Sequence, residues 1–106
     1  MKIEVLYILD CPHYPAAVAE LKSVLAVERI SALISEVLVA NPRMAVMLKF
    51  RGSPTIRIND RDIAGESEAQ HFALSCRLYP GEKQPGVPPA EMIHRAVREA
   101  IRGENQ

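Results

Sequence analysis

The feature that most constrains the fold is a near-continuous apolar run, Ile3 to Leu9, that an amphipathic helix follows almost at once. The run contains β-branched and aromatic residues, which is typical of a strand buried on both faces in the middle of a sheet. A turn at residues 10–15 ends it, and its prolines suit a helix start, where a missing N–H would be unpaired anyway. Apolar residues then recur at helical spacing to about residue 29: Ala17, Val18, Leu21, Val24 and Leu25.

The middle of the chain continues with alternating strand and helix patterns. Ile30 to Val39 is rich in β-formers, although its first residues also fit an extension of the preceding helix. Asn41 and Pro42 open a short helix, for which Asn41 is a good cap. Thr55 to Ile58 alternates as a half-buried strand does. These patterns predict a second strand, a second helix and a third strand.

The last part of the chain predicts a hairpin and a closing helix. Asn59 and Asp60 form a turn signal, and a return strand begins at Arg61. Residues 64–88 are irregular, with one helix expected within residues 66–74. Apolar residues mark a helix from Pro89 onward: Met92, Ile93, Ala96, Val97, Ala100 and Ile101. The order β-α-β-α-β-β-α predicts an α/β fold in which helices flank a four-stranded mixed sheet.

Composition narrows the classes of protein. With 106 residues the chain fits a single domain, residues 1–106. Thirteen basic and thirteen acidic residues argue against a nucleic-acid partner and against adsorption to an anionic membrane. Glu4 interrupts the N-terminal apolar run, so we expect no secretory signal and a cytoplasmic location. Two cysteines exclude a disulfide-dense scaffold and leave room for one redox pair.

Cys11 lies where a strand gives way to a helix. The partial positive charge of a helix N-terminus favours the thiolate over the thiol and raises reactivity. His13 would add to this effect if protonated, whereas the Asp10 carboxylate would oppose it, so the net direction stays open. The alternative is a buried and inert cysteine, which is common for this residue type.

The element order, with Cys11 at the first strand–helix turn and Gly52-Ser53-Pro54-Thr55 before the hairpin, resembles the thioredoxin fold, a three-layer sandwich. The chain is more closely similar to small bacterial thioredoxin-like proteins of the DF type, some of which carry selenocysteine. Across almost the whole chain the matching features are the Cys-Pro-x-Tyr-like turn, the Gly-Ser-Pro-Thr loop, Ser75-Cys76-Arg77-Leu78-Tyr79, and the Gly-x-Pro-Pro start of the final helix.

The resemblance implies a redox site around Cys11. Pro54 would be cis and would pack against Cys11, and the backbone beside Ser53 would stay open to pair with an extended thiol substrate. One departure matters, because Tyr14 stands where a Cys-x-x-Cys motif has its second thiol. This leaves a one-thiol, glutaredoxin-like mechanism or a resolving thiol from elsewhere. Cys76 either returns to Cys11 or is a core cysteine beneath the last helix.

Several other side chains have two open roles each. Tyr14 either donates its hydroxyl toward Cys11 or caps the helix start. Arg77 either pairs with an anionic thiol such as glutathione or is solvated. We expect His71 and His94 at the surface, and Met44, Met47 and Met92 to take part in helix packing and not in a cofactor site.

The sequence therefore favours a thiol–disulfide oxidoreductase that needs no cofactor. Cys11 would attack as the thiolate, and Cys76 or an external thiol would resolve the mixed disulfide of a small-molecule or protein partner. The substrate would contact His13, Tyr14, Ser53, Pro54 and Thr55. One alternative is a soft-metal or organomercurial binding protein with four ligands, Cys11, His13, His71 and Cys76. The other is a thioredoxin-like interaction module that has lost its chemistry.

Overall fold

The computed structural model describes residues 1–65, 72–79 and 85–104. Its elements are β1 (Ile3–Tyr7), α1 (Tyr14–Val27), β2 (Ile34–Leu38), α2 (Pro42–Met47), β3 (Thr55–Ile58), β4 (Arg61–Asp62) and α3 (Ala90–Glu104). The predicted β-α-β-α-β-β-α order is confirmed. The helix expected within residues 66–74 falls mostly outside the described residues, and residues 72–74 are not helical.

The sheet is mixed and four-stranded, with the order β2-β1-β3-β4. β1 is parallel to β2 and antiparallel to β3, and β4 returns antiparallel to β3. The apolar run at the N-terminus therefore forms an inner strand, as its composition predicts. The open question about residues 30–33 is settled, because they belong neither to α1 nor to β2.

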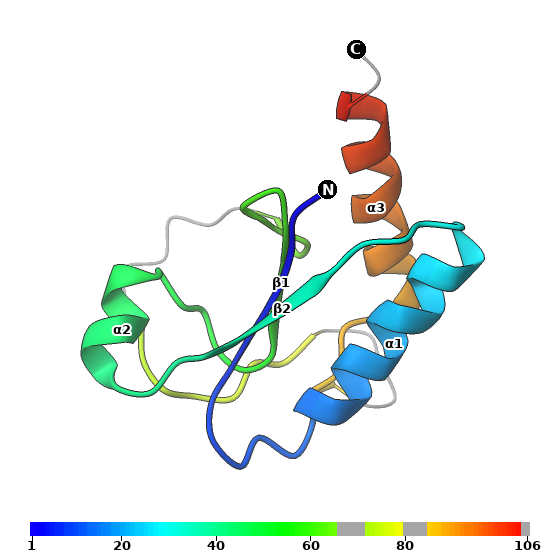
Figure 1. Cartoon of the computed structure of the whole chain (residues 1–106). Coiled ribbons are helices and arrows are strands. Elements are labelled where there is room, and N and C mark those ends of the chain that lie inside the picture. Colours follow the sequence, from blue (N-terminus) through cyan, green and yellow to red (C-terminus); the bar gives the residue numbers. More distant parts are fainter. Residues whose placement is uncertain (66–71, 80–84, 105–106) are drawn as a thin grey trace.

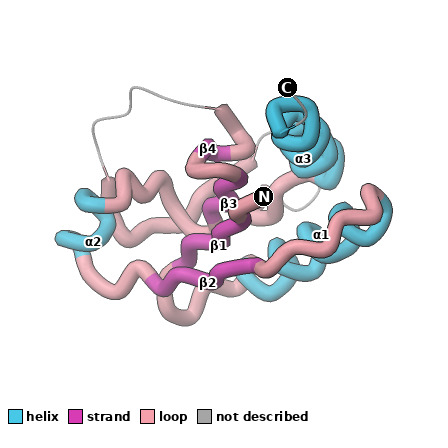
Figure 2. The backbone as a smooth tube through the Cα atoms, turned by 45° about the horizontal axis from the view of Figure 1, so that its top comes forward, coloured by secondary structure: helices cyan, strands magenta, loops and turns pink. Residues whose placement is uncertain are grey.

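The helices lie on both faces of the sheet, with α1 and α3 on one side and α2 on the other (Figures 1 and 2). Alternation along β1 explains this arrangement, since successive side chains point to opposite faces. Ile3 and Val5 join the larger core cluster with α1 and α3, whereas Leu6 packs with Ala45 and Phe50 on the α2 side.

The short helix α2 is capped as expected but packs differently. The Asn41 side chain accepts a hydrogen bond from the Met44 N–H at 2.9 Å. Met44 packs against the smaller core cluster, but Met47 is 72% exposed, so the prediction that Met47 takes part in helix packing is wrong. α2 is only six residues long, and Met47 is its last residue.

A charged contact joins the end of α1 to α3. The Glu28 carboxylate lies 3.0 Å from His94 Nδ1 and accepts a hydrogen bond from Arg98 Nε at 2.9 Å. His94 is therefore half-buried and partnered, unlike the surface histidine expected from the sequence. These two bonds hold the pKa of the Glu28 carboxyl below its usual value of 4.5, and the bond to His94 has the larger effect.

This contact predicts a change in acid stability. A carboxyl with a depressed pKa in the folded state stabilises the fold above its unfolded pKa, and this contribution is lost as the pH falls through the folded value. We expect Glu28→Gln to lower stability at neutral pH and to flatten the acid-side loss below about pH 4.5. Denaturant unfolding at several pH values measures this, with Glu99→Gln, exposed on α3, as the control. If the free energy of unfolding changed with pH in the same way in Glu28→Gln and in the unmutated chain, the prediction would be contradicted.

Candidate functional site

The turn after β1 places Cys11 close to, but not in, the first helix. Its N–H donates to the Ile8 carbonyl at 3.3 Å, and its own carbonyl accepts from the Tyr14 N–H at 3.4 Å. Asp10 adopts a positive φ of 61°, which tightens the turn. His13 is the N-cap of α1, with no capping bond from its side chain. Cys11 is thus buried at 8% exposure just ahead of the helix N-terminus.

The Gly52-Ser53-Pro54-Thr55 loop is buried at all four positions, and the Ser53–Pro54 peptide bond is cis, as the resemblance implies. The Ser53 hydroxyl accepts a hydrogen bond from the Ile8 N–H at 3.1 Å. Because Ile8 also accepts from the Cys11 N–H, Ser53 is two hydrogen bonds away from Cys11. The loop and the cysteine turn therefore form one structural unit.

Cys76 lies on a segment that pairs with the same serine. The Ser53 N–H donates to the Ser75 carbonyl at 2.8 Å, and the Arg77 N–H donates to the Ser53 carbonyl at 2.9 Å. These two bonds form a parallel bridge between Ser53 and Cys76. The backbone of Ser53 is therefore not open to an extended substrate, which corrects that expectation. Cys76 itself is exposed, so its alternative placement as a core cysteine is wrong.

Arg77 is buried, and the expectation of a solvated side chain is wrong. It is 8% exposed, and its guanidinium donates to the Asp62 carboxylate at 2.7 Å and to Thr55 Oγ1 at 3.2 Å. Arg51 approaches the same Asp62 oxygen at 3.1 Å from a less buried position. Arg77 therefore ties the segment that carries Cys76 to β3 and to β4.

Tyr79 completes the attachment of this segment to the loop. Its hydroxyl donates to the Pro54 carbonyl at 2.5 Å, and its ring lies 5.0 Å from the Arg77 guanidinium carbon. Burial raises the pKa of Tyr79 above its usual value, so the phenol stays a neutral donor. Arg77 and Tyr79 thus hold Thr55 and Pro54, while the bridge holds Ser53.

Gly52 is the fourth contact of the loop with this segment. Its φ is +115°, and a Cβ built there would lie 2.9 Å from the Arg77 Cβ. No other residue type supplies both the conformation and the space. The two motifs that the sequence shows separately, residues 52–55 and 75–79, are therefore one packed unit.

Tyr14 takes neither of its expected roles. Its ring stacks on Tyr7, with centroids 3.9 Å apart, and its hydroxyl donates to the Glu36 carboxylate on β2. Burial, followed by the bond to Glu36, raises the pKa of Tyr14 above its usual value. The residue in the position of the missing thiol therefore ties the start of α1 to an edge strand.

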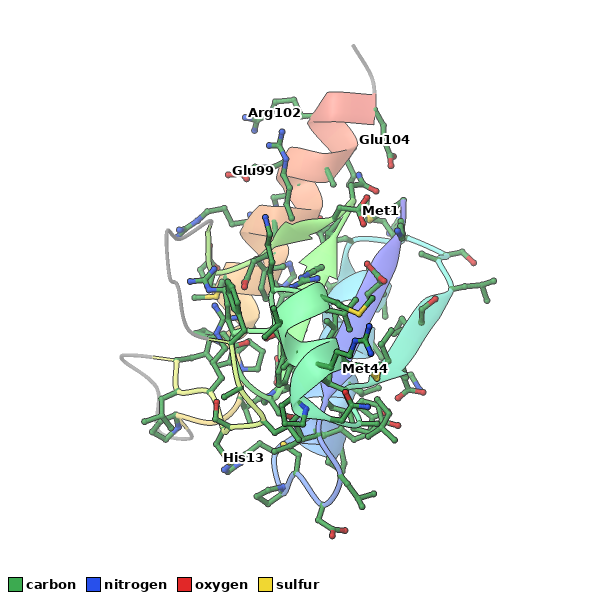
Figure 3. All side chains as sticks on the ribbon, turned by 90° about the vertical axis from the view of Figure 1, so that its left-hand side faces the viewer. Met1, His13, Met44, Glu99, Arg102 and Glu104 are labelled. Carbon is green, nitrogen blue, oxygen red and sulfur yellow. The ribbon has the colours of Figure 1, made fainter. Side chains whose placement is uncertain are left out.

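His13 lies at the end of the molecule opposite Arg102 and Glu104 of α3 (Figure 3). Its ring packs on Gly86, where an added Cβ would come within 2.2 Å of the His13 Cδ2 atom. This packing connects the cysteine turn to the segment that leads into α3. His13 thus has a structural neighbour in addition to the substrate contact expected for it.

The metal alternative receives no support from the described ranges. Within residues 1–65, 72–79 and 85–104, no three or more His, Cys, Asp or Glu side chains gather so as to hold a metal ion. His71, one of the four suggested ligands, lies outside the described residues.

Within residues 1–65, 72–79 and 85–104, no helix combines the length and apolar character needed to cross a membrane.

Sequence reasoning missed three members of this site, namely Asp62, Arg77 in its buried form, and Tyr79. No local signal in the sequence identifies them, because the burial of Arg77 and Tyr79 between the exposed Cys76 and Leu78 is known only from the structure. A buried arginine requires a carboxylate partner, and Asp62 supplies it from a distant part of the chain. Comparison of the chain with family models, curated proteins and solved structures gives no match.

Proposed function

We propose that the chain is a thiol–disulfide oxidoreductase with a thioredoxin-like three-layer fold, in which Cys11 and Cys76 form the redox pair. The observation that carries the proposal is the position of Ser53. Its hydroxyl bonds the turn of Cys11 through Ile8, and its backbone brackets Cys76 on both sides. The two cysteines of the chain are far apart in sequence, but they lie on segments that both form hydrogen bonds with Ser53.

The proposed reaction is thiol–disulfide exchange in two steps. The Cys11 thiolate attacks one sulfur of a substrate disulfide, forms a mixed disulfide and releases the other substrate sulfur as a thiolate. Cys76 then attacks the Cys11 sulfur, which closes the Cys11–Cys76 disulfide and releases the second substrate thiolate. The two protein thiols have supplied two electrons, and two molecules of an external thiol of the glutathione class restore them and leave as their own disulfide.

Both cysteines are free thiols in the structure, which is the form that this first step requires. Such a cycle suits a reducing compartment, and we place the protein in the cytoplasm on that ground. The proposed partners are a small-molecule or protein disulfide and a thiol reductant, with no part for a nucleic acid or a membrane. The balance of thirteen basic and thirteen acidic residues agrees with that choice.

Mild oxidation tests the proposed pair. We expect diamide to produce one intramolecular disulfide, Cys11–Cys76, because both segments are held at Ser53. Non-reducing peptide mapping by mass spectrometry would detect it. A matched control moves the thiol two residues along the same exposed face, in Cys76→Ser with Leu78→Cys, and we expect it to close poorly. Only intermolecular disulfides in the unmutated chain would refute the pair.

A further inference from the structure

The segment that carries Cys76 presents two unlike faces. Cys76 and Leu78 point outward, and Leu78 is 71% exposed, whereas Arg77 and Tyr79 are buried. This is the alternation of a strand, in which neighbouring side chains face opposite sides. In the described part of the chain, one isolated bridge pairs this segment with the Ser53 loop.

A single bridge is a weak determinant of register. If the segment slipped by one residue against Ser53, every side chain would change face, so Cys76 would turn inward and Arg77 outward. Accessibility of the Cys76 thiol therefore depends on whatever prevents that slip. The two backbone bonds at Ser53 cannot do so alone, because a slipped strand offers equivalent backbone groups. The two inward side chains, Arg77 and Tyr79, must therefore supply the rest, and Tyr79 contributes one bond, from its hydroxyl to the Pro54 carbonyl.

Arg77 has the contacts needed to prevent the slip. Its guanidinium meets the Asp62 carboxylate of β4, Thr55 Oγ1 of β3 and the ring of Tyr79. A planar guanidinium bonds in fixed directions, which gives geometric specificity that an apolar side chain lacks. A buried ion pair adds little net stability over well-packed apolar residues, so its geometry is the stronger reason for its presence.

We propose that Arg77 is a positioning residue for Cys76, with the buried Arg77–Asp62 pair acting as the register lock that keeps the Cys76 thiol exposed beside the Ser53 loop. This inference rests on the proposed function only for its redox consequence. The lock itself is a statement about which face Cys76 occupies, and it is testable without any substrate.

Arg77→Met tests the lock, and Arg51→Met is its matched control. Both changes remove one guanidinium from the same Asp62 oxygen, and each leaves the other arginine in place. Only Arg77 belongs to the segment of Cys76. The readouts are alkylation of Cys76 by iodoacetamide, followed by peptide mass spectrometry, and the equilibrium of the Cys11–Cys76 disulfide with glutathione.

We expect Cys76 to react in one phase in the unmutated chain and in Arg51→Met. In Arg77→Met we expect two phases, the second at least about tenfold slower because the slipped register buries the thiol. The equilibrium constant for forming the Cys11–Cys76 disulfide from the two thiols and oxidised glutathione should fall about tenfold in Arg77→Met. This corresponds to a change of about 30 mV in the reduction potential of the pair. Arg77→Lys keeps the charge but loses the planar fork, and we expect intermediate values.

Single-phase alkylation and an unchanged disulfide equilibrium in Arg77→Met would overturn the lock. If Arg77→Met does not fold, Arg77→Lys decides, and behaviour identical to that of Arg51→Met would overturn the proposal. Failure of the proposed function looks different. In that case the unmutated chain forms no Cys11–Cys76 disulfide, while the alkylation of Cys76 still separates Arg77→Met from Arg51→Met.

Discussion

Replacement of Cys11 by serine is expected to abolish the reduction of small disulfides such as hydroxyethyl disulfide. A serine hydroxyl is not ionised at neutral pH and forms no stable bond to a substrate sulfur, so the mixed disulfide cannot form. We expect a loss of at least about a thousandfold, the scale seen when the nucleophile of a cooperating set is removed. A glutathione-coupled assay would measure it.

The matched variant is Cys76→Ser, in which the sulfur of the second thiol is likewise replaced by oxygen. With glutathione present we expect this variant to keep part of its activity, because an external thiol can resolve the Cys11 mixed disulfide. Trapped mixed disulfides on Cys11 should then be visible by mass spectrometry when glutathione is left out. Full activity in Cys11→Ser would contradict Cys11 as the attacking thiol. Loss in Cys76→Ser alone would assign attack to the exposed thiol.

The parts of the fold that follow from local patterns could be predicted from the sequence. The run from Ile3 is apolar on both faces, so an inner strand is its only stable position, and the structure confirms it. The same holds for the Asn41 cap and the hairpin at Asn59, because their turn chemistry depends on neighbours in the chain.

The contacts that build the candidate site could not be predicted, because they join residues distant in sequence. Arg77 reads as a surface cation until its partner Asp62, fifteen residues earlier, is known to face it. Tyr14 reads as a cap until Glu36 is found on the adjacent strand. A buried charge is stable only with such a partner, and a local pattern does not identify one.

The close fit of the two motifs leads to the second large effect, which concerns Gly52. Gly52→Ala is expected to lower the free energy of unfolding by about 3 kcal/mol or more, from backbone strain and from overpacking together. The strain arises because φ is +115° at this position. The overpacking arises because the new Cβ would lie 2.9 Å from the Arg77 Cβ and 3.2 Å from the Arg77 Cα and N atoms. These atoms belong to the backbone and its first side-chain carbon, so they cannot move aside as the end of a flexible side chain can.

Gly65→Ala separates these two causes. Gly65 also has a positive φ, +92°, but an added Cβ there meets no atom of the described residues within 4 Å. We therefore expect this variant to lose only about 1–2 kcal/mol, from strain alone. The difference between the two variants, measured by urea unfolding, reports the packing of residues 75–77 against the loop. Because relief of the clash must move that segment away from Ser53, Gly52→Ala should also disturb alkylation of Cys76, and Gly65→Ala should not. Equal losses of stability in the two variants would mean that the segment does not press on Gly52.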